Sequence, residues 1–146
     1  MREETILGRS GQPLYRIEVP AKWERVGVAA SEDTTLPIAE FRAGDVRFVI
    51  HNFPGKKIPP PLQVERWKGQ SKPRRIEAAA FSGYRGLVFE SDTVLAWALE
   101  WGATKKGEGE EMADVTLKAT GPIEKLREEV LSSARTFERM SSPCEW

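Results

Sequence analysis

The stretch that most constrains the fold is residues 112–140, where the hydrophobic period changes at a Gly-Pro break. Before the break, Val115, Leu117 and Ala119 alternate with polar residues, which predicts a strand over residues 113–120 with one apolar and one solvent-facing side. After the break, apolar residues recur at steps of three and four, at Ile123, Leu126, Val130, Ala134 and Phe137. We therefore expect a long amphipathic C-terminal helix that packs on an antiparallel sheet.

Residues 93–101 predict a central strand of that sheet, because both of its faces are apolar. Leu95, Trp97 and Leu99 share one face, and the small residues Ala96 and Ala98 lie on the other. We expect the alanine side to let a helix approach closely and the bulky side to fill the opposite layer.

The remaining elements alternate with turn signals. A helix of about two and a half turns is predicted at residues 62–70, after the proline-rich stretch 54–61. Such a stretch can be a polyproline ligand, but more often it stiffens a loop and starts a helix. Further strands are predicted at residues 15–19, 24–30, 37–43, 46–53, 76–81 and 87–89. The pattern indicates an α+β domain.

Length and charge restrict the class of protein. At 146 residues the chain is expected to form a single domain over residues 1–146, with residues 1–12 and 141–146 as flexible tails. Lys plus Arg is 22 and Asp plus Glu is 22, a balance that argues against nucleic acid as a partner. No stretch approaches the ~20 apolar residues of a membrane span. With no signal-peptide pattern either, the expected location is cytoplasmic.

Residues suited to catalysis or metal binding are scarce. His51 is the single histidine, and Cys144, the single cysteine, lies near the C-terminus. A zinc cluster is excluded, and no calcium loop or glycine-rich phosphate loop is present. The sequence therefore predicts no catalytic residues, no metal site and no cofactor.

One cluster of cations is a candidate for partner binding. Lys68, Lys72, Arg74 and Arg75 follow or end the short predicted helix. They indicate a site for an acidic partner or anion, and solvated loop charge is the alternative explanation.

Three segments resemble the Mog1/PsbP-like family and its small bacterial members. Residues 15–23, YRIEVPAKW, form an opening strand followed by proline and tryptophan. Residues 64–70, VERWKGQ, are similar to an Arg-Trp-x-Gly-Gln stretch of bacterial members. Residues 115–122, VTLKATGP, lead into a helix that ends SSARTF.

The resemblance implies a three-layer α/β/α sandwich with a central antiparallel sheet, a short mid-chain helix and a long C-terminal helix. It also implies a non-catalytic role, since family members assist photosystem II assembly or bind the Ran GTPase. No family site residue matches a position here, and the expected lack of an export signal departs from the thylakoid and periplasmic members.

Two functional hypotheses follow. The first is a non-enzymatic accessory or protein-binding domain, whose partner is a protein of unknown identity. The alternative is a small-ligand-binding protein or enzyme with a pocket between the sheet and its helices, to which His51 or Arg66 would contribute.

Overall fold

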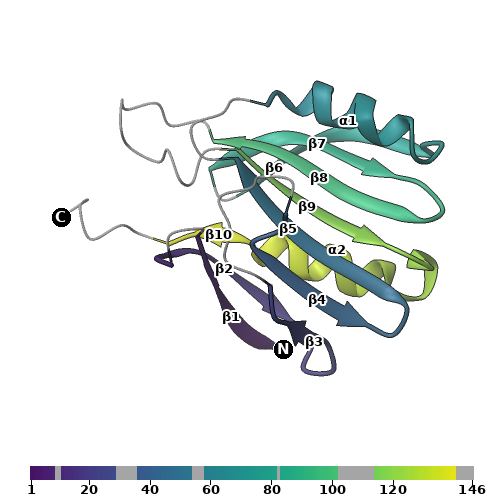
Figure 1. The fold of residues 1–146 in the computed structure, drawn as a ribbon. Helices are drawn as coiled ribbons and strands as arrows, with labels where there is room; N and C mark the ends of the chain where they lie inside the picture. The colour runs from purple at the N-terminus through teal and green to yellow at the C-terminus, as the bar shows by residue number, and fades with distance from the viewer. Residues whose placement is uncertain (9–10, 29–35, 54–57, 82, 102–113, 141–146) are drawn as a thin grey trace.

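The computed structural model describes residues 1–8, 11–28, 36–53, 58–81, 83–101 and 114–140, and its strands form two antiparallel sheets (Figure 1). The larger sheet has seven strands in the order β3-β4-β5-β9-β8-β7-β6. Their bounds are β3 Glu24–Val26, β4 Ala39–Ala43, β5 Val46–Phe53, β6 Arg75–Phe81, β7 Tyr84–Glu90, β8 Val94–Trp101 and β9 Asp114–Thr120.

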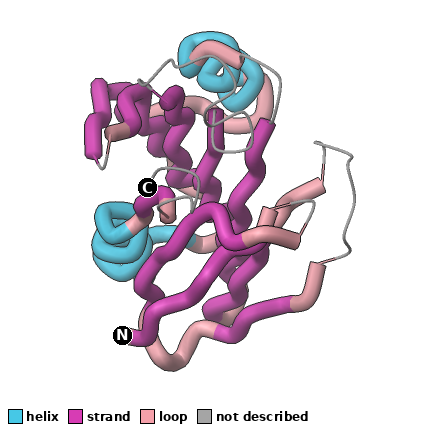
Figure 2. The backbone as a smooth tube through the Cα atoms, turned by 90° about the vertical axis from the view of Figure 1, so that its left-hand side faces the viewer, coloured by secondary structure: helices cyan, strands magenta, loops and turns pink. Residues whose placement is uncertain are grey.

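The smaller sheet has three strands in the order β1-β2-β10, with bounds Arg2–Leu7, Pro13–Val19 and Glu138–Arg139. Helix α1 spans Pro60–Lys68, and a 3₁₀ turn, η1 at Ile123–Leu126, precedes helix α2 at Arg127–Thr136. The two helices lie on separate sides of the molecule (Figure 2). Helix α1 packs on β7 and β8, whereas α2 packs beside β2 on the opposite face of the large sheet.

The expected three-layer α/β/α sandwich with a long C-terminal helix is wrong. The described residues form ten strands in two antiparallel sheets with two short helices, so the protein is mostly β. On one face of the large sheet, α2 packs together with the small sheet. The prediction had assigned this layer to helices alone.

The C-terminal helix is shorter than its apolar period predicted. Pro122 has ψ of 79°, which is not helical, and the chain makes a 3₁₀ turn before α2 begins at Arg127. At the other end Phe137 is already extended, with ψ of 128°, and leads into β10. Ile123 and Phe137 are buried as predicted, but Ile123 lies in the 3₁₀ turn and Phe137 is the extended residue after α2. The apolar spacing predicted which side chains are buried, but it did not predict the backbone hydrogen bonding.

The N-terminal residues were predicted to be a flexible tail, whereas Arg2–Leu7 is strand β1 paired with β2. Only Ile6 of this strand is fully buried, so its sequence carries little hydrophobic signal. The side chain of Arg2 donates hydrogen bonds to the backbone carbonyl oxygens of Ala21 and Trp23, at 2.8 and 2.5 Å. The predicted tail at residues 141–146 lies outside the described part of the chain.

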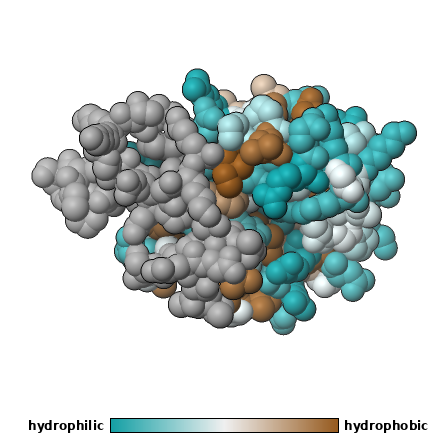
Figure 3. Space-filling view, turned by 45° about the horizontal axis from the view of Figure 1, so that its top comes forward, coloured by the Kyte–Doolittle hydropathy of each residue, from teal (hydrophilic) through white to brown (hydrophobic). Residues whose placement is uncertain are grey.

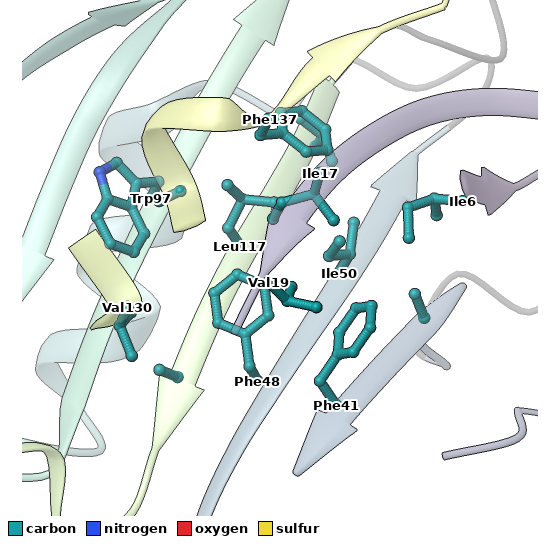
Figure 4. Close-up of a cluster of buried hydrophobic side chains, with 14 of the residues drawn as sticks. Ile6, Ile17, Val19, Phe41, Phe48, Ile50, Trp97, Leu117, Val130 and Phe137 are labelled. Atoms are coloured by element: carbon teal, nitrogen blue, oxygen red, sulfur yellow. The ribbon is translucent and has the colours of Figure 1, made fainter. Parts of the chain in front are cut away.

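The main core lies between the large sheet and the layer made of the small sheet and α2 (Figure 4). Side chains from β2, β5, β9 and α2 meet there, among them Ile17, Phe48, Leu117 and Val130. Leu95, Trp97 and Leu99 of β8 belong to this core, as the sequence predicted. Trp23 is also buried and contacts the ring of Phe48 at 5.8 Å between centroids.

A second, smaller core lies under α1 on the other face of the large sheet. Val64 and Trp67 of α1 pack there against Ala96 and Ala98, which confirms that the alanine side of β8 admits a helix. The polar side of β9 was predicted to face solvent, but Asp114 and Thr116 are buried on this face. The backbone N–H of Ile58 donates to the Asp114 carboxylate at 2.8 Å, which compensates its burial.

Candidate functional site

The edge strand β6 is the first candidate surface. It ends the order of the large sheet, so one of its two sides has no strand partner among the described residues. Its seven residues pair with β7 in continuous register, from Arg75 opposite Glu90 to Phe81 opposite Tyr84. Ile76, Ala78 and Ala80 are exposed on the α1 side. Within the described residues, the outer edge of β6 is therefore accessible, and several of the side chains along it are small.

The start of β6 is held by a nearly buried carboxylate, that of Glu90. It accepts hydrogen bonds from Nε of Arg75 at 3.0 Å and from Nε and Nη2 of Arg127 at 2.5 and 3.1 Å. These hydrogen bonds lower the pKa of Glu90, and those from Arg127 have the largest effect. Burial acts in the opposite direction and raises this pKa. Glu90 therefore joins β6, β7 and α2.

The four cations predicted to bind a partner do not form one cluster of free charge. Lys68 ends α1 and pairs with Glu65 at 2.8 Å, and Arg75 turns toward Glu90 and Glu77. Arg74 forms an exposed pair with Asp92 at 3.3 Å. Lys72 is exposed and has no ion pair within the described ranges. Lys72 and Arg74 thus remain as accessible charge at the start of β6.

The second candidate surface surrounds Lys118 of β9, where the cover provided by α1 ends. Lys118 lies opposite Val49 of β5 and Ala96 of β8. Its Nζ donates to Oε1 of Gln70 at 2.7 Å and lies 5.9 Å from the ring centroid of Trp67. Burial, followed by the charges of Arg66 and Arg47, lowers its pKa. A partly buried ammonium is thus held beside two guanidinium groups.

Arg47 also lies on this side of the sheet, where it and Arg42 donate to the same carboxylate. Glu40 is nearly buried and accepts from Nη2 of Arg47 at 2.9 Å and from Nε of Arg42 at 3.1 Å. These hydrogen bonds lower the pKa of Glu40, and the one from Arg47 has the largest effect. Glu40 therefore pairs with Arg42 and Arg47, while Arg47 and Arg66 are the cations that act on Lys118 on the same side of the sheet.

Sequence reasoning missed Lys118, since strand alternation placed it among residues expected to face solvent. A signal was nevertheless present in the segment VERWKGQ, because Arg66, Trp67 and Gln70 all contribute to the surroundings of Lys118. Arg66, named in the small-ligand hypothesis, belongs to this surface.

His51 lies on the same sheet face, opposite Thr116, and is partly buried. Among the residues that the structure describes, no three His, Cys, Asp or Glu side chains are placed to hold a metal ion.

The proline-rich stretch starts a helix, as its structural interpretation predicted. Pro59 precedes α1 and Pro60 is its first residue, where the missing N–H costs no helical hydrogen bond. Residues 54–57 of this stretch lie outside the described ranges.

Where Figure 3 draws described residues, their surface is mainly hydrophilic, with small groups of hydrophobic atoms among polar ones. Among the described helices, none combines the length and apolarity that crossing a membrane requires.

Searches against protein-family models and against curated proteins find no match to this chain.

Proposed function

We propose that this protein is a non-enzymatic binding domain that takes an extended segment of a partner protein as an additional strand beside β6. The observation that supports the proposal is the seven-residue edge strand, which has exposed side chains and one side that no described strand covers. In strand addition, main-chain hydrogen bonds supply affinity and the flanking side chains supply specificity.

The two edges of the large sheet differ in a way that favours β6. Proteins protect sheet edges with short strands, prolines, bulges or charges, because unpaired N–H and C=O groups attract other strands. The opposite edge, β3, has only three residues. β6 has neither proline nor lysine, and its one carboxylate, Glu77, is engaged by Arg75 at 2.9 Å. The run Ala78-Ala79-Ala80 leaves its backbone open to approach.

The charge at the start of β6 indicates which segment would fit. Lys72 is exposed without an ion pair in the described part of the chain, and the pair of Arg74 with Asp92 is solvent-exposed and weak. A segment with an acidic residue at the end that lies beside Lys72 and Arg74 would complement them. The occupant is therefore an acidic, extended partner segment.

The test is to select peptides on the intact protein from a displayed random library and then compare two adjacent proline variants. In an antiparallel edge strand, neighbouring residues direct their N–H groups alternately into and away from the sheet. Of Ala78→Pro and Ala79→Pro, one therefore removes a hydrogen bond to β7 and lowers stability, while the other removes only an outward donor. We expect the second variant to keep its melting temperature and to lose about tenfold in affinity for the selected peptide.

Selected peptides without acidic residues, or unchanged affinity in both proline variants, would contradict the proposal. Size-exclusion chromatography of the protein alone is the control for a different occupant. A dimer that the outward-donor variant dissociates would show that a second copy of this chain fills the edge.

A further inference from the structure

We propose that Lys118, Arg66 and Arg47 form a binding site for a phosphate group at the border between α1 and β9. The site is separate from the β6 edge and does not depend on the proposed strand addition. It makes concrete the alternative in which a small ligand binds between the sheet and a helix.

The first support is the position of Lys118. It projects from a central strand of the large sheet and lies beside α1, where its ammonium contacts the face of Trp67 and the side-chain oxygen of Gln70. Trp67 is itself buried and contacts Phe89 at 5.9 Å between ring centroids, so its indole is a fixed platform. The ammonium is therefore positioned in advance, which reduces the entropy lost on binding.

The second support is the charge around it. Every charged group that shifts the pKa of Lys118 is a cation, namely Arg66 and Arg47. Of the carboxylates on this sheet face, Glu40 already accepts from both Arg42 and Arg47, and Asp114 accepts from the backbone N–H of Ile58. Lys118 and Arg66 have no ion pair among the residues that the structure describes. Two uncompensated cations beside a third are suited to a doubly charged anion.

The third support is the number of available donors. An ammonium carries three N–H donors, and Gln70 accepts from Lys118 at one of them. Arg66 is exposed and offers a planar set of N–H groups, which matches phosphate oxygens in a bidentate arrangement. The amide nitrogen of Gln70 is a further donor, since its oxygen is the atom engaged by Lys118. A phosphate dianion supplies enough acceptors for these groups, whereas one carboxylate supplies fewer.

Isothermal titration of the intact protein tests the site, with inorganic phosphate and glycerol phosphate as probes and sodium chloride keeping the ionic strength constant. We expect both probes to bind, and acetate to bind at least about tenfold more weakly, since it carries one charge and two oxygens. Equal affinities for the two phosphates would assign the site to free phosphate. Tighter binding of glycerol phosphate would assign it to a phosphorylated molecule.

The variants are Lys118→Met and Arg66→Gln, with Lys68→Gln as the matched control. Each site variant is expected to weaken phosphate binding about tenfold or more, since it removes charge-assisted hydrogen bonds. Arg66 is exposed on α1, so Arg66→Gln keeps the test valid if Lys118→Met alters folding. Lys68 lies on the same helix, carries the same charge and is paired with Glu65, so its removal should change affinity less than about twofold.

Wild-type affinity in Arg66→Gln and in folded Lys118→Met would overturn the proposal. Acetate binding as tight as that of phosphate would also overturn it, as would an equal loss in Lys68→Gln, because both would indicate a diffuse effect of positive charge.

Discussion

Replacing Glu90 by glutamine should destabilise the protein by about 2 kcal/mol. The variant keeps the shape of the side chain and removes the charge that three guanidinium N–H groups share, two from Arg127 and one from Arg75. Breaking a buried ion pair costs about 3–5 kcal/mol when the remaining charge stays buried. Here the side chains of Arg75 and Arg127 are 29 % and 36 % exposed, so water can solvate them in part and the cost is reduced.

The assay is urea denaturation followed by tryptophan fluorescence, with Glu128→Gln as the control. Glu128 also pairs with Arg127, at 3.2 Å, but its side chain is 86 % exposed, so its loss should cost at most about 0.5 kcal/mol. A cost of 2 kcal/mol corresponds to a melting temperature lower by roughly 4–8 °C for a domain of this size.

The effect of Glu90→Gln should also depend on pH. The folded-state pKa of Glu90 is lowered, so its carboxylate contributes its full stabilisation above its unfolded-state pKa of about 4.3 and loses it as the pH falls through the folded-state value. The difference between wild type and variant should therefore be constant from about pH 6 to 8 and should shrink in acid. A variant as stable as wild type at neutral pH, or a difference that grows in acid, would refute the role assigned to Glu90.

Three further predictions concern the sheet and its buried groups. Gly86→Ala should destabilise the protein by about 1–3 kcal/mol in the same assay, because a Cβ there would lie 1.8 Å from the carbonyl oxygen of Ala98. A variant as stable as wild type would refute the close approach of β7 and β8 at this position. Burial raises the pKa of the Tyr84 hydroxyl, so spectrophotometric titration should show a component that ionises late, and Tyr84→Phe should remove the contribution of Tyr84 to it. Since only the unfolded state releases this proton near pH 10, wild-type stability should fall more steeply than that of Tyr84→Phe as the pH rises above about 10.

The sequence predicts strands well where both hydrophobicity and period are strong. Residues 46–53 and 93–101 were predicted almost to the residue as β5 and β8, and the division of β8 into an alanine face and a bulky face is confirmed. Such strands are central, so local pattern and tertiary packing agree.

The elements that were missed or mispredicted depend on contacts between distant residues. β1 is recognisable only through its pairing with β2, because half of its residues are charged and Ile6 alone is fully buried. The short β10 likewise exists because Glu138 and Arg139 pair with Arg16 and Tyr15. Without these two strands, the small sheet could not be predicted, and the layer was assigned to helices.

The candidate surfaces were predicted in part. The cations at residues 68–75 were identified, but sequence cannot show that Arg75 is held by a glutamate 15 positions away, at Glu90, while Lys72 stays accessible. Lys118 was placed in the correct strand and on the same side as Asp114 and Thr116, but that side was wrongly predicted to face solvent, since Lys118 is partly buried there. Its environment was missed because the alanines of β8 predicted that a helix packs there but not that this helix is α1, which brings Trp67 and Gln70 to Lys118.

The central claim is that a partner strand adds to β6, and hydrogen–deuterium exchange of the intact protein tests it most directly. Exchange should be measured with and without a saturating amount of the selected acidic peptide. The account predicts slower exchange at residues 75–81 on binding, with β3, at the other edge of the sheet, unchanged. Protection confined to any other element, with β6 exchanging as fast as in the free protein, would contradict it.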